Sequence, residues 1–211
     1  RFAKDNRDRR GVVAVGANDG MLHVFAADTG KELLAYLPGN LFSTGKSQGY
    51  HYLTDPDYSH RYYVDGTPAV SDVFMSSRFS SAPQWRSVLV GIEGSGGRGL
   101  FALDLTDPGQ LEESKATHIA LWEFSSNDDP HLGHTLARPT IALLPNGRWA
   151  AIVGNGYEHN ATGTPTSGQA ELFVIFLDGG LDRKWTAGRD YLRIPTGVRS
   201  VTHRHGLSPP A

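Results

Sequence analysis

Oxygen-bearing side chains gather in one stretch of the chain, Ser125–Pro130. Calcium takes about six to eight oxygen ligands, and a linear calcium loop alternates its carboxylates and bends at a glycine. Here the two aspartates are adjacent, and the stretch has neither the alternation nor the glycine. The pattern therefore favours a turn with a solvated acidic tip over a metal site. The metal candidates in this stretch are Asn127, Asp128 and Asp129.

Histidines are the second group that could hold a metal. His131 and His134 are spaced H-x-x-H, and His203 and His205 are spaced H-x-H. Zinc or copper can bind imidazoles at such spacings, but a catalytic site also needs a third ligand and an open position. Nothing in the sequence shows that these side chains converge, so the pattern favours structural or solvent-facing histidines. His23 follows a turn in an alternating segment and is expected to be a packing residue with satisfied ring nitrogens.

The glycine run Gly94–Gly99 satisfies the G-x-G-x-x-G pattern of dinucleotide-binding turns. Such a site needs a helix directly after the glycines, because the free amides of its first turn face the pyrophosphate. Leu100–Leu105 instead alternates like a strand, so the run predicts a hairpin loop. The chain also lacks a nucleophile elbow, an H-E-x-x-H motif and a P-loop. We therefore predict no catalytic residues, no cofactor-binding residues and no enzyme activity in this segment.

The composition restricts the remaining classes of protein. Of the 211 residues, 39% are hydrophobic and 20% charged, which suits a folded core. The 25 glycines and 12 prolines disfavour a helical bundle, because both residue types break helices. A net charge of −2 provides no basic field for nucleic acid, and no apolar run is long enough for membrane insertion. The absence of cysteine excludes thiol catalysis, disulfides and thiolate zinc sites.

Short alternating segments separated by turn residues predict the strands that would position these side chains. Asn18-Asp19-Gly20 lies between the first two segments, and these residue types tolerate the positive φ of a hairpin turn. The predicted strands are 12–15, 22–26, 31–36, 67–73, 86–92, 100–105, 119–124, 139–144, 149–153, 171–177 and 182–186. Trp122 and Trp185 fall in outermost strands, where we expect large aromatic side chains to pack between neighbouring units.

A four-stranded unit that repeats at nearly constant spacing indicates a β-propeller blade. We predict an all-β fold of four-stranded antiparallel blades, like that of quinoprotein dehydrogenases, with about three blades of a larger propeller. The predicted parts of this partial propeller domain, residues 1–211, are strands two to four of a blade at 11–37, blades at 64–125 and 136–187, and the start of another at 206–211. Because propellers close with about four to eight blades, we expect a segment of a longer protein. The alternative is a complete β-sandwich of similar strand number.

Antiparallel strand order places alternate connections at opposite ends of a blade. Loops between the second and third strands share one end with the loops that lead to the next blade. Those loops are Pro38–Val64, Gly91–Gly99, Ser125–Ala137 and Gly154–Gly168, and most of them are long. Long loops in a compact domain are often functional. We therefore expect any binding surface at this end, which we call the long-loop end.

Four stretches, in this order, resemble the PilY/PilC family of type IV pilus biogenesis and tip-adhesin proteins of Gram-negative bacteria. They are Val15–Leu33, then Tyr63–Val70, then Leu121–Phe124 with Leu132-Gly133 after it, then Gly147–Trp149 through Gly154–Tyr157. The resemblance covers roughly residues 10 to 211. The family-motif residues, which we expect to be structural, are Asn18, Asp19, Gly20, His23, Asp65, Gly66, Trp122, Trp149, Asn155, Gly156 and Tyr157.

The resemblance implies a modified seven-bladed propeller in the C-terminal half of a larger protein, which is exported through the periplasm to the cell surface or the outer membrane. It implies a role in pilus assembly and in attachment, with minor pilins and a host or abiotic surface as partners. Members of the family can bind calcium in an Asp-rich loop beyond the strand that begins like Leu207–Ala211, so calcium is implied for the full-length protein and no cofactor for this segment. The alternatives are a dehydrogenase propeller that holds a quinone cofactor and a periplasmic scaffold propeller.

Overall fold

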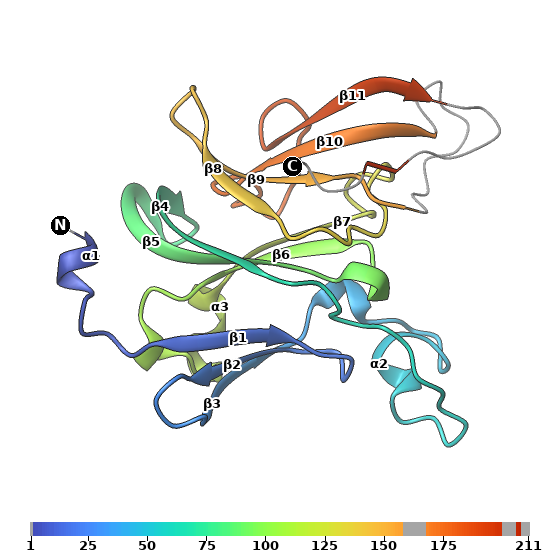
Figure 1. Ribbon diagram of the computed structural model, residues 1–211, viewed down its shortest axis with the longest axis horizontal. Helices are drawn as coiled ribbons and strands as arrows, with labels where there is room; N and C mark the ends of the chain where they lie inside the picture. The colour runs from blue at the N-terminus through green and yellow to red at the C-terminus, as the bar shows by residue number, and fades with distance from the viewer. Residues whose placement is uncertain (1, 158–167, 200–205, 208–211) are drawn as a thin grey trace.

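Three antiparallel sheets make up the chain in a computed structural model that describes residues 2–157, 168–199 and 206–207 (Figure 1). Sheet 1 has the strand order β1-β2-β3, with β1 (Val12–Gly16), β2 (Leu22–Ala26) and β3 (Glu32–Tyr36). Sheet 2 has the order β4-β5-β6-β7, with β4 (Ala69–Ser77), β5 (Ser80–Ile92), β6 (Gly99–Asp104) and β7 (Ala120–Ser125). Sheet 3 has the order β11-β10-β9-β8, with β8 (Thr140–Leu143), β9 (Trp149–Gly154), β10 (Gln169–Phe176) and β11 (Tyr191–Arg199). In every sheet, consecutive strands are neighbours.

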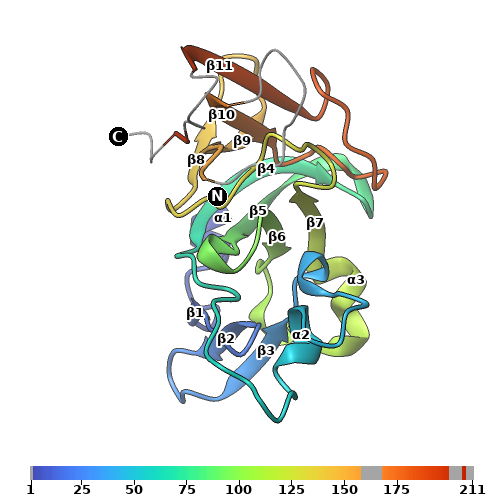
Figure 2. The same cartoon turned by 90° about the vertical axis from the view of Figure 1, so that its right-hand side faces the viewer.

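Helical turns are short and lie outside the sheets (Figure 2). They are α1 (Phe2–Asp5), η1 (Gly39–Leu41), α2 (Gly49–Tyr52), η2 (Gly94–Gly96), η3 (Pro108–Gln110), η4 (Glu113–Lys115) and α3 (Ala116–Ile119). Within the described ranges, none of the helices has the length and apolar character that a membrane span requires.

Sheet 2 lies between the other two sheets and buries both of its faces (Figure 2). Along β6, Leu100 and Ala102 belong to the apolar cluster shared with sheet 3, whereas Phe101 and Leu103 belong to the cluster shared with sheet 1. This division follows from the strand itself, because successive side chains point to opposite faces. We call the contact between sheets 1 and 2 the first junction and the contact between sheets 2 and 3 the second junction.

Stacked four-stranded meanders are the arrangement expected of consecutive propeller blades. Three sheets in succession also exclude the alternative of a sandwich, which has two sheets face to face. The strands of sheets 1 and 2 fall within the expected ranges 11–37 and 64–125. However, β4 and β5 are longer than the sequence pattern predicts, and they meet in a tight hairpin that contains Arg78.

One predicted strand is wrong. The segment 182–186, expected as the outermost strand of the third blade, forms turns, and the strand paired with β10 is β11 (Tyr191–Arg199). Local hydrogen bonds hold the turns: Asp182 accepts from the Lys184 backbone N–H, and Asp190 accepts from that of Thr186. Such side-chain acceptors compete with strand pairing. Sheet 3 therefore extends past the expected boundary at residue 187, and of the expected blade start at 206–211 only residues 206 and 207 are described.

Candidate functional site

The described parts of the predicted long loops meet at one end of the sheets, at the right of Figure 1, and residues 158–167 of the loop 154–168 lie outside the described residues. Asn40, after β3, donates a hydrogen bond of 2.8 Å to Glu93, which follows β5. The Gly133 N–H, in the loop after β7, donates to the Asn155 carbonyl at 2.7 Å. His134 contacts the Gly94 carbonyl at 3.2 Å through Nδ1. Connections from all three sheets therefore form one surface, which is the long-loop end expected from strand order.

The turn between β1 and β2 is held by a small polar network. Asp19 accepts from the Met21 backbone N–H, and its other carboxylate oxygen lies 2.9 Å from Nε2 of His23. Glu32 lies 2.5 Å from Nδ1 of the same histidine. The hydrogen bond to Glu32 raises the pKa of His23, burial opposes the shift, and Asp19 adds to it. His23 is thus a packing residue with both ring nitrogens satisfied, as the sequence predicts. Asn18 links this turn to the next connection, because its side-chain oxygen accepts from the Tyr63 backbone N–H.

Three motif glycines are required by close approach. A Cβ on Gly20, where φ is +97°, would lie 2.4 Å from the ring of Tyr50. A Cβ on Gly66 would lie 2.1 Å from the Ile92 side chain, and a Cβ on Gly156, where φ is +67°, would lie 2.0 Å from the His134 carbonyl. Distances this short exclude any side chain. Asp65, beside Gly66, is exposed. Its backbone N–H donates to the carbonyl of Glu93, the residue after Ile92.

Asn155 is the most buried polar motif residue, with an exposed fraction of 0%. Its amide group donates to the Gln169 carbonyl, and its oxygen accepts from the backbone N–H groups of Glu171 and Leu207. It therefore ties β9, β10 and residue 207 together. Tyr157, two residues later, pairs through its backbone with His134 and exposes about half of its side chain.

The motif tryptophans pack between sheets. Trp122, on β7, is buried and donates its indole N–H to the Leu177 carbonyl at 3.0 Å. Trp185, in the β10–β11 connection, donates its indole N–H back to the Glu123 carbonyl at 2.8 Å. The two rings meet edge to face with centroids 5.5 Å apart. Trp149, at the start of β9, packs against the same cluster. The predicted packing of Trp122 and Trp185 between units is therefore confirmed, although Trp185 lies in a loop.

The metal candidates 127–129 do not converge, and the expected solvated tip is only partly correct. Asp128 caps the turn by accepting from the backbone N–H of Ser125. Asp129, by contrast, is buried. It accepts a hydrogen bond from the Tyr191 hydroxyl at 2.9 Å and pairs with Arg193 at 3.2 Å. Asn127 contacts Asn40 and is exposed. In the part of the chain that the structure describes, no group of three or more histidine, aspartate or glutamate side chains is arranged to hold a metal.

A buried charged cluster surrounds Asp129. His131 lies 2.8 Å from the carboxylate of Glu171, and Arg193 lies 3.7 Å from the same carboxylate. Burial raises the pKa of Glu171 to about 7, Arg193 opposes the shift and Asp129 adds to it. This cluster joins the β7–β8 connection to β10 and β11, so His131 is structural, whereas His134 contacts the loop after β5. His203 and His205 lie outside the described residues.

The glycine run after β5 is a hairpin loop, as predicted. η2 occupies its first half, and β6 begins at Gly99, where a dinucleotide site would need a helix. Two of its glycines make room for a carboxylate, since a Cβ on Gly97 or Gly99 would lie less than 3 Å from the Glu93 side chain. Burial raises the pKa of Glu93 to about 7, the hydrogen bond from Asn40 opposes the shift, and the charge of Glu123 adds to it.

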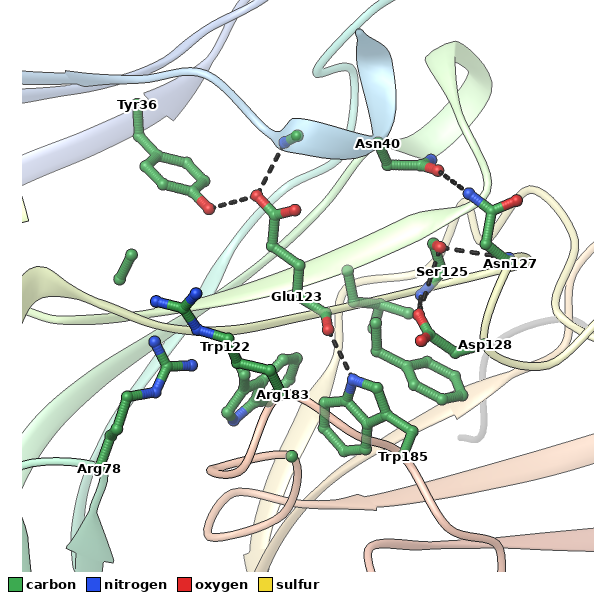
Figure 3. Close-up of a pocket in the computed structure, with 15 residues that line it drawn as sticks. Tyr36, Asn40, Arg78, Trp122, Glu123, Ser125, Asn127, Asp128, Arg183 and Trp185 are labelled. Carbon is green, nitrogen blue, oxygen red and sulfur yellow. Dashed lines mark hydrogen bonds between the residues drawn. The ribbon is translucent and has the colours of Figure 1, made fainter. Parts of the chain in front are cut away.

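A pocket of about 510 Å³ lies along the outer edge of β7, and we call it the rim pocket (Figure 3). The pocket is lined by residues of β3, η1, the β4–β5 hairpin, β6, β7 and the connections that follow β7 and β10. They include Tyr36, Asn40, Arg78, Trp122, Glu123, Asn127, Asp128, Arg183 and Trp185. Glu123 accepts from the Tyr36 hydroxyl at 2.5 Å and from the Gly39 N–H at 2.8 Å. Burial raises the pKa of Tyr36, and the charge of Glu123 adds to the shift.

Sequence patterns did not identify Arg78, Glu123 or Arg183 as members of one site. They belong to three segments far apart in the chain, and no spacing links them, although Glu123 lies within the family stretch Leu121–Phe124. The polar residues Asn127 and Asp128 were singled out for a different reason. Local patterns therefore indicated Asn127 and Asp128 as metal candidates and Trp122 and Trp185 as packing residues, but not that these residues share a pocket.

Comparisons with known proteins give a consistent result. The family model of the PilY1 beta-propeller domain matches residues 1–201. A type IV pilus biogenesis factor PilY1 homolog from Xylella fastidiosa is 44% identical over 179 residues, which cover 84% of this chain and 11% of that protein. The type IV pilus biogenesis factor PilY1 of Pseudomonas aeruginosa is 39% identical over 204 residues, which cover 94% of this chain and 15% of that protein.

A solved structure agrees with these relatives. The crystal structure of the Pseudomonas aeruginosa PilY1 C-terminal domain aligns with a TM-score of 0.70 and 34% identity, over 100% of this chain and 35% of that chain. The chain thus spans about a third of the solved chain and a smaller share of the curated relatives. These matches confirm the predicted β-propeller fold and the PilY/PilC resemblance. This chain belongs to the PilY1 β-propeller domain family of type IV pilus biogenesis factors.

Proposed function

We propose that this chain is a non-enzymatic propeller module of a type IV pilus biogenesis protein, which supports pilus assembly and attachment to surfaces or host cells. The observation that carries the proposal is the identity of 39–44% to PilY1 biogenesis factors over most of the chain. We propose minor pilins and a host or abiotic surface as the partners. We propose the cell surface as the location.

The long-loop end is the surface that we assign to these contacts. Phe42 exposes 64% of its side chain and Tyr62 exposes 53%, and both belong to the connection between sheets 1 and 2. Tyrosine and other aromatic side chains supply large contact areas at low cost in conformational entropy. Contacts between the loops, from Asn40 to Glu93 and from His134 to the Gly94 carbonyl, hold this end in place.

The test is deletion of the gene in its native host, followed by complementation with wild type or with Phe42→Ser and Tyr62→Ser together. We expect deletion to remove surface pili and twitching, and the double variant to restore them poorly. Phe79→Ser with Trp85→Ser is the matched control, because both are exposed aromatics outside the long-loop end, at 46% each. Normal piliation in the deletion strain would contradict the proposal and favour a periplasmic scaffold.

The remaining alternative is a dehydrogenase propeller with a quinone cofactor. That chemistry needs a stacking tryptophan, a cation near the quinone oxygens and metal-holding carboxylates at the propeller axis. Quinone absorbance after reconstitution, together with dye-linked alcohol oxidation, would establish this alternative instead.

A further inference from the structure

The rim pocket has a cationic end made of two guanidinium groups. Arg78 donates to the Leu181 carbonyl through Nε and to the Leu121 carbonyl through one terminal nitrogen, both at 3.2 Å. These bonds hold the side chain in the pocket wall and leave its other terminal nitrogen free of hydrogen bonds to the described residues. Arg183, which is exposed, makes no side-chain hydrogen bond or ion pair with any residue that the structure describes. Figure 3 shows both guanidinium groups directed into the pocket.

Arg183 also has an unusual backbone. Its φ of +63° is the only positive value at a non-glycine residue in the described ranges. The left-handed region is unfavourable for a side chain with a Cβ, and residues held there often belong to functional sites. Glycine would suit this turn better, yet the position carries a long cationic side chain over the pocket.

The opposite end of the pocket presents oxygen acceptors. The Glu123 oxygen that does not bind Tyr36 and Gly39 receives no hydrogen bond from a described residue. Asn127 is exposed, and Asp128 uses one carboxylate oxygen for its turn. Hydroxyl groups of a ligand would satisfy these acceptors, whereas a second anionic group would be repelled by the two carboxylates.

Aromatic side chains form the floor between the two ends. Trp122, Phe124 and Trp185 line it; Trp122 and Phe124 are buried, so Trp185, which is only partly buried, supplies the accessible aromatic surface. A concave site with an aromatic floor and a few convergent polar groups is typical of small-molecule binding, and about 510 Å³ lies in the usual range. The C–H face of a sugar ring suits the accessible surface of Trp185.

We propose that the rim pocket binds a saccharide residue that carries one carboxylate, such as a uronic or sialic acid. The two guanidinium groups would hold the carboxylate, as arginine does in bidentate pairs. The acceptors around Glu123 would bind the hydroxyl groups. This inference deepens the attachment part of the proposed function and rests on that function for its biological purpose.

The test is a titration of the purified native protein with D-galacturonate, D-glucuronate and N-acetylneuraminate, with D-galactose as the neutral counterpart. We expect the acidic sugars to bind more tightly than galactose, and added salt to weaken their binding. Arg183→Gly should weaken it by about tenfold or more, since one charged hydrogen-bonding group is lost. Glycine accepts the left-handed backbone, so this variant retains the fold. Lys184→Ala is the matched control, because Lys184 is an exposed neighbouring cation outside the pocket.

Three results would overturn the inference: equal binding of galactose and the acidic sugars, acidic-sugar binding unaffected by Arg183→Gly, or no saccharide binding. An oligoglutamate peptide that binds in an Arg183-dependent manner, in place of the sugars, would also overturn it and indicate a peptide site. Pili and twitching in the Arg183→Gly strain separate the two proposals. Normal pili in the Arg183→Gly strain, together with lost uronate binding by the variant protein, would support this inference. Normal pili in the deletion strain would contradict the proposed function alone.

Discussion

The two junctions between neighbouring sheets bury carboxylates in different ways. At the first junction the partners are neutral: Asn40 donates to Glu93, and Tyr36 donates to Glu123. At the second junction they include cations, because Arg193 contacts both Asp129 and Glu171. The second junction also has the larger aromatic cluster, with the indole rings of Trp122 and Trp185 at its centre.

This difference shows that one architecture can bury charge by two routes. A neutral donor leaves the desolvation of a carboxylate largely uncompensated, so protonation becomes easy. A cation offsets part of that cost, but removing either partner then leaves a buried charge. Burial raises the pKa of Glu93 at the first junction and of Glu171 at the second to about 7, so we expect both junctions to respond to pH and the second, with its cationic partner, to respond to truncation as well.

The largest effect should come from Trp122→Ala at the second junction. This change removes a buried indole, its hydrogen bond to Leu177 and its edge-to-face contact with Trp185. We expect a loss of about 3–5 kcal/mol in the free energy of unfolding, measured by chemical denaturation. Trp85→Ala is the control, because Trp85 is 46% exposed and should cost under about 1 kcal/mol. Equal losses would contradict the central role of the Trp122 cluster.

The next effect is the pH dependence of the first junction. The pKa of Glu93 is raised to about 7 in the folded protein, so the native state binds this proton more tightly than the unfolded state does. Its contribution is therefore favourable at low pH and declines as the pH rises from about 4.5 through about 7. Glu93→Gln should remove up to about 3 kcal/mol of this decline, measured as unfolding free energy across pH.

Glu171→Gln sharpens the comparison. The pKa of Glu171 is also raised to about 7, so a residual slope remains in Glu93→Gln. Removal of the Glu171 charge also takes a partner from His131 and Arg193, so this variant should be less stable than wild type even above pH 7. A Glu171→Gln variant that only flattens the pH profile would show that the two junctions do not differ in this respect.

The smallest effect should come from single hydroxyl groups. Tyr36→Phe removes a hydrogen bond to Glu123, which keeps the Gly39 N–H as a donor. We expect a loss of about 1.5 kcal/mol in the free energy of unfolding. Tyr191→Phe removes a hydrogen bond to Asp129, but Asp129 keeps Arg193 and the backbone N–H of His131 as donors. The loss in the free energy of unfolding should therefore be smaller for Tyr191→Phe. The reverse order would show that cationic partners do not protect the second junction.

Much of the fold could be predicted from local patterns. Alternation with a period of two identified ten of the eleven strands, because successive side chains of a strand point to opposite faces of its sheet. The turn at Gly20 was predictable because glycine tolerates a positive φ, and the packing of Trp122 was predictable because the residue falls in an outermost strand. The exception is β11: Trp185 favoured a strand at 182–186, but Asp182 and Asp190 accept hydrogen bonds from the backbone of Lys184 and Thr186 and hold that segment out of the sheet.

The sequence alone predicted an all-β repeat, because strands and turns depend on residue types at short, regular spacings, and the family followed from the resemblance of four stretches of residues to known members. Only the tertiary structure decided that Asp129 is buried against Arg193, and that Arg78, Glu123 and Arg183 share one pocket. Burial and convergence depend on how three sheets stack. No local spacing encodes which distant segments meet, because those contacts arise from packing between sheets rather than from neighbours along the chain.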